Sequence, residues 1–341
     1  MALQRFVGDL LRSLRLHAFV FVFRILLRWR TAAHIRRDSA VLPLAEAGVR
    51  QKRVQVPSRD PGRTILAHLY LPLRPDEDGR PLPVLVNWHG SGFVFPLHGT
   101  DAYFCTRMAR DCGLAVLDAD YRKAPEHPCP AAIDDAEDAL RWVASSASSS
   151  PSNFNLDSSR VAVSGFSAGG HIAAAAASHL RKKLEKDLDI AMLLSIYAPS
   201  PSLRAHAPWI LRMFADAYAP DPASRTDPAV SPGFADAEAY PQTTAFLTCE
   251  GDNLRWEIEA LVARLREVEG GPEGNEGDGG KKREVHYKML EGVCHAFDKG
   301  IKEDGGGSLP WTRREEAYAW AAELLKDALH PKQWDGARIA R

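Results

Sequence analysis

The pentapeptide Gly165–Gly169, with the sequence G-F-S-A-G, constrains the fold more than any other segment. It lies between a short apolar run, Val161–Ser164, and an alanine-rich stretch from Gly170 that is typical of a helix. A serine on a sharp turn from a strand to a helix is held in a strained conformation with its hydroxyl exposed. The flanking glycines are needed because a Cβ there would collide with the neighbouring turn. Ser167 is therefore the candidate nucleophile, and the alternative is a glycine-rich turn with a capping serine.

A catalytic serine needs partners, which can be sought elsewhere in the chain. Its hydroxyl is a poor nucleophile near neutral pH, so it requires a base, usually histidine, and a carboxylate that orients the base. It also requires N–H donors aimed at the developing oxyanion. On a strand–turn–helix unit of this kind, the acid and then the histidine follow the serine along the chain, and the second oxyanion donor lies on an earlier loop.

The earlier loop is His89–Phe93, which directly follows the apolar run Pro83–Trp88. Its glycines let the backbone approach a substrate closely and leave N–H groups free. We assign the N–H groups of Ser91, Gly92 and Ala168 to an oxyanion hole. The His89 ring is expected to hold the loop by hydrogen bonds rather than to act as the base. An ordinary glycine turn is the alternative. The predicted oxyanion-hole segment comprises His89, Gly90, Ser91, Gly92 and Ala168.

The candidate acid is Asp252, which follows the apolar run Thr244–Cys249 and a two-residue turn. A carboxylate just past the C-terminal end of a strand lies on the side of the sheet where α/β enzymes bind ligands. Two alternatives remain open. Asp252 could be the N-cap of the helix that follows, a position that favours aspartate, and Glu250 is a nearby competitor for the role of the acid.

The candidate base is His295, in the loop after the strand-like alternation Val285–Leu290. A histidine in the loop after the last strand can swing over the nucleophile. The chain contains 12 histidines, so any one of them is usually structural. His295 is singled out by this setting, which His34, His68, His98, His179, His206, His286 and His330 lack.

These residues resemble the hormone-sensitive-lipase-like branch of the α/β-hydrolases, which includes microbial esterases, arylacetamide-deacetylase-like enzymes and plant carboxylesterases. The resemblance covers residues 50–330 and rests on several motifs, namely His89–Gly92, Asp118–Pro128, Gly165–Gly170, Asp227-Pro228 with Ser231-Pro232, and His295–Phe297. It implies an α/β-hydrolase fold with a mostly parallel eight-stranded sheet, helices on both faces and a helical cap. It also implies a catalytic triad of Ser167, Asp252 and His295.

The same resemblance implies a serine carboxylester hydrolase that acts on a small-molecule ester through an acyl-enzyme, with no metal and no organic cofactor. An acyltransferase or an elimination catalyst with the same triad is the alternative. A receptor on an inactive hydrolase scaffold is disfavoured, because relatives of that kind lose the base histidine. The Asp118–Pro128 loop is implied to support the oxyanion loop, through Asp118, Asp120, Tyr121 and Arg122.

Two departures from the family pattern bear on the substrate. Ser91 stands where the family usually has a third glycine, and Phe166 replaces the usual aspartate before the nucleophile. Both changes predict a narrow, apolar pocket that suits an ester with a small or medium acyl group. The side chains expected to line it are Phe93, Phe166, Trp209, Met213 and Phe214.

Composition limits the class of protein. The chain has 341 residues, of which 45% are hydrophobic and 26% charged, as in globular proteins with a packed core. A net charge of −1 argues against nucleic acid as a partner, since such binding needs a strong positive patch. The five cysteines show no C-x-x-C pair or zinc spacing. They predict reduced thiols and a cytoplasmic location, with peripheral attachment to a membrane as a further option.

The order of elements predicts a catalytic domain at 51–330. Apolar stretches alternate with helical ones, which predicts a mostly parallel sheet. The domain contains a cap insertion at about 200–235 and an amphipathic helix at 131–144, followed by a serine-rich linker. A segment rich in glycine and glutamate, 269–283, is expected to be disordered. The predicted strands are 64–71, 83–88, 114–119, 160–164, 190–197, 243–249 and 284–290.

The N-terminal segment, residues 1–50, supports two compatible interpretations. Residues 1–40 contain eight arginines and an apolar run, Ala18–Phe23, which Arg24 ends. This run is too short for a spanning helix, which needs about 20 apolar residues. In the family the N-terminal helices join the 200–235 segment in a cap over the active site. An arginine-rich amphipathic helix within residues 1–30 could instead lie on a membrane surface.

Overall fold

A computed structural model describes residues 2–73, 80–148, 154–199, 208–269, 283–299, 301 and 307–330. Almost all of the segment predicted to be disordered, 269–283, lies outside these residues.

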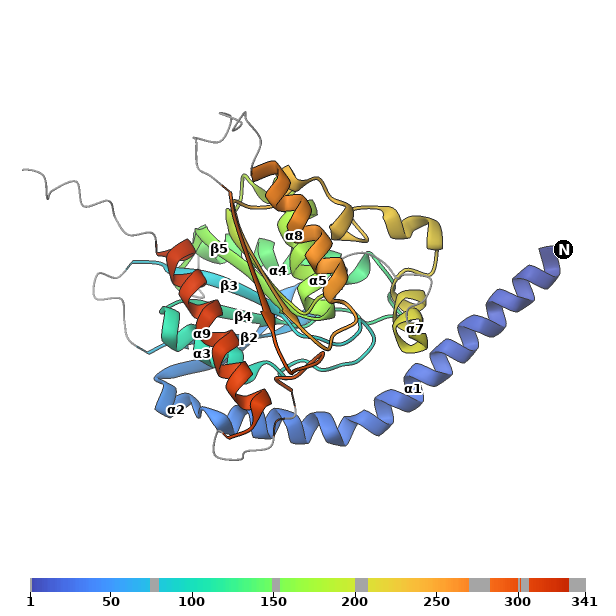
Figure 1. The fold of residues 1–341 in the computed structure, drawn as a ribbon, viewed down its shortest axis with the longest axis horizontal. Helices are drawn as coiled ribbons and strands as arrows, with labels where there is room; N and C mark the ends of the chain where they lie inside the picture. Colours follow the sequence, from blue (N-terminus) through green and yellow to red (C-terminus); the bar gives the residue numbers. More distant parts are fainter. Residues whose placement is uncertain are drawn as a thin grey trace, which may run out of the picture.

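The centre of the molecule is one eight-stranded sheet with the order β1-β2-β4-β3-β5-β6-β7-β8 (Figure 1). Pairs from β4 onward are parallel, whereas β2 is antiparallel to β1 and to β4. The predicted sheet is confirmed. Its strands are β1 Val49–Pro57, β2 Thr64–Pro72, β3 Leu82–Trp88, β4 Ala115–Ala119, β5 Leu156–Phe166, β6 Ile190–Ile196, β7 Thr243–Cys249 and β8 Glu284–Leu290.

The first strand, β1, is absent from the seven stretches predicted as strands. It lies at the edge of the sheet and pairs only with β2. Most of its side chains are exposed, and those of Arg50, Lys52 and Arg53 are charged. Because so few of its side chains are buried, its sequence lacks the alternation that identifies a half-buried strand.

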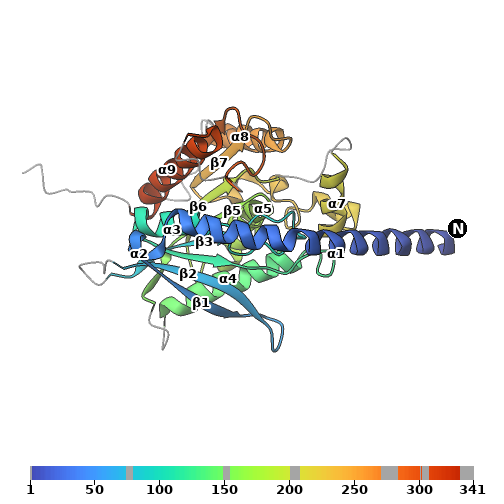
Figure 2. The same cartoon turned by 90° about the horizontal axis from the view of Figure 1, so that it is seen from below.

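Helices cover both faces of the sheet and bury two separate cores (Figures 1 and 2). Side chains of α3 and α9 pack on one face, and those of α4, α5 and α8 pack on the other. The helix predicted at 131–144 runs on to Ser148, because Ala144 and Ser146 still face the interior where a linker was expected. The α-helices are α1 Ala2–Val41, α2 Leu44–Ala47, α3 Ala102–Cys112, α4 Ala131–Ser148, α5 Ala168–Ala175, α6 Arg181–Leu184, α7 Trp209–Tyr218, α8 Arg255–Glu269 and α9 Leu309–Leu329.

Helix α1 is a single helix of 40 residues whose N-terminal part projects beyond the rest of the molecule (Figure 2). Its inner side packs beside α7 and against the segment after the His89–Phe93 loop, in a small cluster around Val20. Arg24 fixes this contact, since its guanidinium donates to the main-chain oxygens of Val94 and Ala124, both at 2.8 Å. In the part of the chain that is described, no helix has the length and apolar character that crossing a membrane requires.

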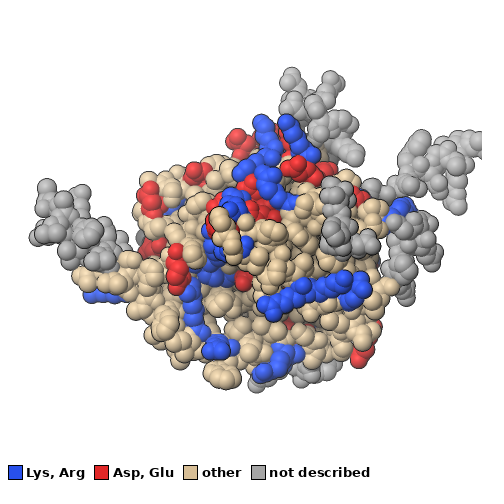
Figure 3. Space-filling view, turned by 180° about the vertical axis from the view of Figure 1, so that it is seen from behind, with Lys and Arg blue, Asp and Glu red and all other residues tan. Residues whose placement is uncertain are grey.

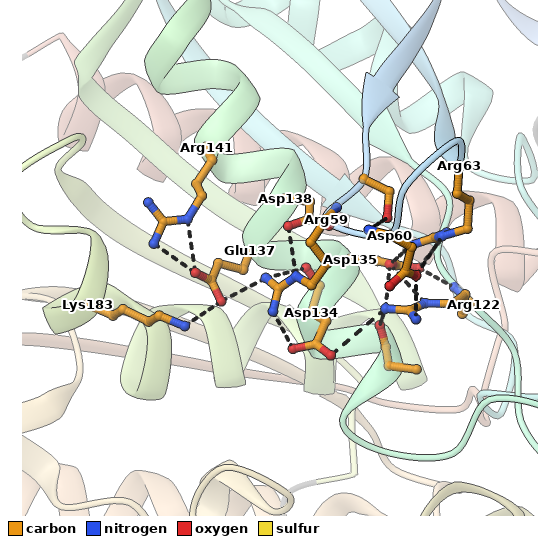
Figure 4. Close-up of polar contacts among 12 residues, drawn as sticks. Arg59, Asp60, Arg63, Arg122, Asp134, Asp135, Glu137, Asp138, Arg141 and Lys183 are labelled. Atoms are coloured by element: carbon orange, nitrogen blue, oxygen red, sulfur yellow. Dashed lines mark hydrogen bonds and ion pairs between the residues drawn. The ribbon is translucent and has the colours of Figure 1, made fainter.

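A network of arginines and carboxylates holds the Asp118–Pro128 loop against α4 and the β1–β2 turn (Figure 4). Asp135 is at its centre and is fully buried. Its carboxylate accepts hydrogen bonds from the main-chain N–H and the Nε of Arg122, at 2.8 and 3.0 Å, and from the guanidinium of Arg63. These hydrogen bonds to Asp135 are the contacts through which Arg122 can support its loop, as expected.

Replacing Asp135 by asparagine should lower the free energy of unfolding by about 3 kcal/mol, because the partly buried guanidinium groups of Arg63 and Arg122 would lose a fully buried counter-charge. Urea denaturation of the purified protein measures this change. The matched control is Asp187→Asn, which removes an exposed ion pair with Arg141 and should cost less than about 1 kcal/mol. Equal effects of the two substitutions would contradict this account of the network.

Candidate active site

Ser167 occupies the sharp turn between β5 and α5, with backbone angles φ 52° and ψ −120°. A non-glycine residue with positive φ is strained and persists only where its surroundings demand it. The glycines on either side permit the turn. A Cβ at residue 165 would overlap the carbonyl group of Gly169, and a Cβ at residue 169 would overlap the main-chain oxygen of Trp88. The chain can therefore form this turn only with glycine at both positions.

The structure brings the three predicted residues together in one hydrogen-bonded chain. The Nε2 of His295 lies 2.9 Å from the Oγ of Ser167, and its Nδ1 lies 2.7 Å from the Oδ2 of Asp252. Asp252 is buried, whereas the His295 side chain is about a third exposed. This arrangement lets one imidazole take a proton from the serine while the carboxylate fixes its tautomer.

Asp252 can serve both as the acid of the site and as the cap of the helix that follows. Glu250, the other candidate acid, makes a different contact. While Oδ2 contacts His295, the Oδ1 atom accepts a hydrogen bond of 2.9 Å from the N–H of Leu254, just before α8. One carboxylate thus contacts the imidazole and also holds the start of the helix. Glu250 is exposed, and its carboxylate accepts from the N–H of Gly292 at 2.9 Å.

The His89–Phe93 loop is held from behind by the Asp118–Pro128 loop. The buried His89 ring stacks on Tyr121, and its Nε2 lies 3.2 Å from Asp120. The Tyr121 hydroxyl donates to the His89 main-chain oxygen at 2.8 Å and lies 2.6 Å from the Ser91 hydroxyl. Burial lowers the pKa of His89, which keeps the ring neutral. Although burial alone would raise the pKa of Asp120, the hydrogen bond from His89 and the charge of Lys123 hold it well below its usual range.

This loop lies directly beside the nucleophile. A Cβ on Gly90 would stand 3.3 Å from the Cβ of Ser167 and 3.0 Å from the main-chain oxygen of Phe166. Gly92 has φ +57°, and a Cβ there would meet the ring of Phe214 at 2.8 Å. Within the described chain, the backbone N–H groups of Ser91, Gly92 and Ala168 donate to no other residue. They are therefore available to a bound oxyanion.

A cavity of about 1170 Å³ opens over Ser167 and His295. Of the five side chains predicted to line it, Phe93 and Phe214 do so. The face of α7 turned towards the cavity carries Ile210, Leu211 and Phe214. Helix α1 contributes a further wall, made of Leu27, Arg30, Thr31, His34 and Arg37.

Three of the predicted pocket residues lie elsewhere. Phe166 is fully buried in the core on the other face of the sheet, between the Phe104 ring and the ammonium group of Lys299, because successive residues of a strand point to opposite faces. Trp209 and Met213 lie on another side of α7 and pack against α1, Trp209 in edge contact with Phe19. Phe166 therefore cannot narrow the pocket, and the Ser91 hydroxyl is engaged by Tyr121.

The sequence did not reveal the support beneath His295. Tyr197 places its ring edge-to-face with the imidazole, at 4.9 Å between centroids, and its hydroxyl donates to Asp298 at 2.5 Å. Lys299 bridges Asp298 and Asp101, at 2.9 and 2.7 Å. Although burial alone would lower the pKa of Lys299, these carboxylates raise it, so the ammonium group stays charged. The sequence signal that could have indicated this support is the charged pair Asp298-Lys299, which directly follows His295–Phe297.

One group among the described residues could hold a metal ion. Nitrogen atoms of His68 and His98 and a carboxylate oxygen of Asp118 lie within 4.8 Å of one another. The group lies behind the His89–Phe93 loop, and none of its members lines the cavity over Ser167. His98 already interacts through Nε2 with the main-chain oxygen of Asp118 at 3.0 Å, which accounts for its position without an ion.

Comparisons with known proteins show what this chain is similar to. Residues 85–299 match a family model described as alpha/beta hydrolase fold. Tuliposide A-converting enzyme b1, amyloplastic, from Tulipa gesneriana is 40% identical over 119 residues, which are 33% of this chain and 32% of that protein. Carboxylesterase NlhH from Mycobacterium tuberculosis is 38% identical over 191 residues, 51% of this chain and 57% of that protein. The matches thus span about a third to somewhat more than half of these relatives' length.

The likeness in structure extends further along the chain. A hyperthermophilic esterase from the archaeon Pyrobaculum calidifontis superimposes with a TM-score of 0.70 and 27% identity. That comparison covers 90% of this chain and 93% of the esterase. From the family model, the sheet and the motifs together, the chain belongs to the α/β-hydrolase family, in the hormone-sensitive-lipase-like branch that its sequence resembles.

Proposed function

We propose that this protein is a serine carboxylester hydrolase. The observation that carries the proposal is the hydrogen-bonded chain from Ser167 through His295 to Asp252, with free N–H groups beside the serine and an apolar cavity above it. Relatives named as a carboxylesterase and an esterase support the same reaction class. These groups supply the nucleophile, base, orienting carboxylate and oxyanion donors that acyl transfer needs.

The proposed reaction proceeds in two halves. His295 takes the proton of the Ser167 hydroxyl as the oxygen attacks the ester carbonyl, and the oxyanion accepts hydrogen bonds from the N–H groups of Ser91, Gly92 and Ala168. His295 then protonates the leaving alcohol, which leaves an acyl-enzyme. Water activated by the same imidazole releases the acid and restores the serine. Asp252 stabilises the imidazolium in both halves without being protonated itself.

The cavity supports an apolar ester with a small or medium acyl group. Helices α1 and α7, proposed here as the cap, close it from two sides. The Phe214 ring lies close against Gly92, and this contact limits the room beside the proposed oxyanion hole. Each CH₂ group buried in such a cavity adds about 0.8 kcal/mol until the available space is filled.

A series of p-nitrophenyl esters from acetyl to palmitoyl tests this proposal. We expect kcat/KM to hold or rise from acetyl to about hexanoyl and to fall for longer chains, which would have to displace the Phe214 ring. The variant Phe214→Ala should move the optimum to longer chains, whereas Trp209→Ala, on another side of α7, should leave the order unchanged. A steady rise to palmitoyl in the wild-type protein would refute the proposed acyl length, and no turnover of any ester would refute the activity.

A further inference from the structure

Helix α1 has two apolar faces, and only one of them is covered. The inner face packs on the body of the protein through Leu16, Val20, Phe23 and Leu27. The outer face carries a second apolar row at successive spacings of three or four residues, which places its members on one side of a helix. This outer row comprises Leu11, Leu14, Ala18, Val22, Ile25 and Trp29.

The outer face is exposed to an extent that is unusual for apolar side chains. Trp29 is 80% exposed, and Phe21 and Leu26, which border the row, are each 63% exposed. Of the twelve large apolar side chains that are exposed in the described chain, seven belong to α1. Continuous apolar surface of this kind marks an interaction site in a protein that otherwise buries its core well.

Charge identifies what fits this surface. Between residues 11 and 37 the helix contains no aspartate or glutamate, and exposed arginines, including Arg15 and Arg28, border the outer row. Arg24 is the inward exception and pairs with Glu126. In the space-filling view from behind, the described part of α1 that leads to its grey N-terminal end is mostly tan, with blue at its edge (Figure 3). Two copies packed through this face would bring arginines together, whereas an anionic lipid surface would neutralise them.

The same helix forms a wall of the active-site cavity. Leu27 and His34 line the cavity from the inner side of α1, whereas Arg30 lines it one helical turn after Leu26, at the border of the outer row. Trp209 of α7, 59% exposed, lies beside α1 through its contact with Phe19. Aromatic side chains and arginines are typical of segments that lie at the level of the lipid headgroups. A surface that held the outer face would therefore lie across α1 from the cavity, with Arg30 and Trp209 at the border between them.

We propose that the outer face of α1 lies on the surface of an anionic lipid bilayer, and that the substrate is an ester that partitions into that bilayer. The second half of this inference rests on the proposed esterase function. A small or medium acyl group on a long lipophilic alcohol satisfies both requirements, since the acyl part fits the cavity and the alcohol part keeps the ester in the lipid.

The test is co-sedimentation of the full chain with vesicles of phosphatidylcholine alone or mixed with phosphatidylserine. We expect binding to the mixed vesicles that weakens at about 0.5 M NaCl, where screening shortens the reach of the arginines. The triple variant Val22→Ser, Ile25→Ser, Trp29→Ser should bind at least about tenfold more weakly. A control variant, Leu73→Ser, Phe234→Ser, Leu309→Ser, removes three exposed apolar side chains elsewhere and should bind like the wild type.

Two ester substrates separate the parts of the inference. Hydrolysis of p-nitrophenyl acetate in solution should be equal in all three proteins, whereas hydrolysis of hexadecyl acetate in mixed vesicles should fall only in the triple variant. Wild-type protein that cleaves the soluble ester but ignores both kinds of vesicle would overturn the docking. Vesicle binding without cleavage of either ester would overturn the substrate and the proposed function. A dimer that the triple substitution dissociates, seen by light scattering, would assign the face to a second copy and overturn the bilayer.

Discussion

Replacement of Ser167 by alanine is expected to lower kcat for ester hydrolysis by about 10⁴-fold or more, because no other group can form the acyl-enzyme at this position. A steady-state assay with p-nitrophenyl acetate measures the loss. The fold should survive, since the alanine keeps the Cβ and removes only a hydroxyl that bonds to His295. A serine-directed phosphonate should label the wild-type protein at this residue alone and should not label the variant.

The matched control is Ser91→Ala. The proposed role of Ser91 in catalysis uses its backbone N–H, and its hydroxyl contacts Tyr121 instead. Loss of that hydroxyl should cost less than about tenfold in kcat, because the oxyanion donor stays in place. If the Ser167 variant kept activity within tenfold of the wild type, or if the phosphonate labelled another residue, the assignment of the nucleophile would be wrong.

Replacement of Asp252 by asparagine should cost about 10⁴-fold in kcat. The amide oxygen can still accept from the N–H of Leu254, so the start of α8 stays held. The amide nitrogen would then face the Nδ1 of His295 and favour the tautomer that cannot accept the proton of Ser167. Activity should drop with little change in stability, and thermal unfolding alongside the kinetic assay checks both.

The control for this prediction lies two residues away. Among the described residues, the Glu250 carboxylate accepts a hydrogen bond only from the N–H of Gly292 at the surface, so Glu250→Gln should change kcat little. The opposite ranking, with the glutamine variant inactive and the asparagine variant active, would transfer the role of the acid to Glu250.

The sequence predicted the centre of this site because the constraints there are local. A strained serine needs glycine on both sides, and these glycines meet main-chain atoms that no rearrangement of side chains can move away. The acid and the histidine follow strands whose apolar runs are clear, and the carboxyl ends of parallel strands meet at one edge of a sheet. The positions of Ser167, Asp252 and His295 relative to one another therefore followed from their order in the chain.

The walls of the cavity could not be predicted in the same way. Phe166 directly precedes Ser167, yet it points into the core of the opposite face, where it packs against Phe104. Which face of α7 turns inward depends on how α1 packs beside it, and no local pattern encodes that contact. The support from Tyr197 arises from a strand that is distant in sequence from His295. These side chains are placed by packing between elements, so their roles became visible only in the folded chain.

Arg24 connects helix α1 to the His89–Phe93 loop through hydrogen bonds. Its guanidinium donates a hydrogen bond to the main-chain oxygen of Val94. The N–H of Val94 in turn donates to the main-chain oxygen of Ser91 at 3.1 Å. A shift of α1 along its axis would therefore be passed through two hydrogen bonds to the peptide group between Ser91 and Gly92. The N–H of that peptide group is a proposed oxyanion donor. The second of these hydrogen bonds joins two main-chain groups within one turn. Helix α1 is thus connected by hydrogen bonds to the turn that carries a proposed oxyanion donor.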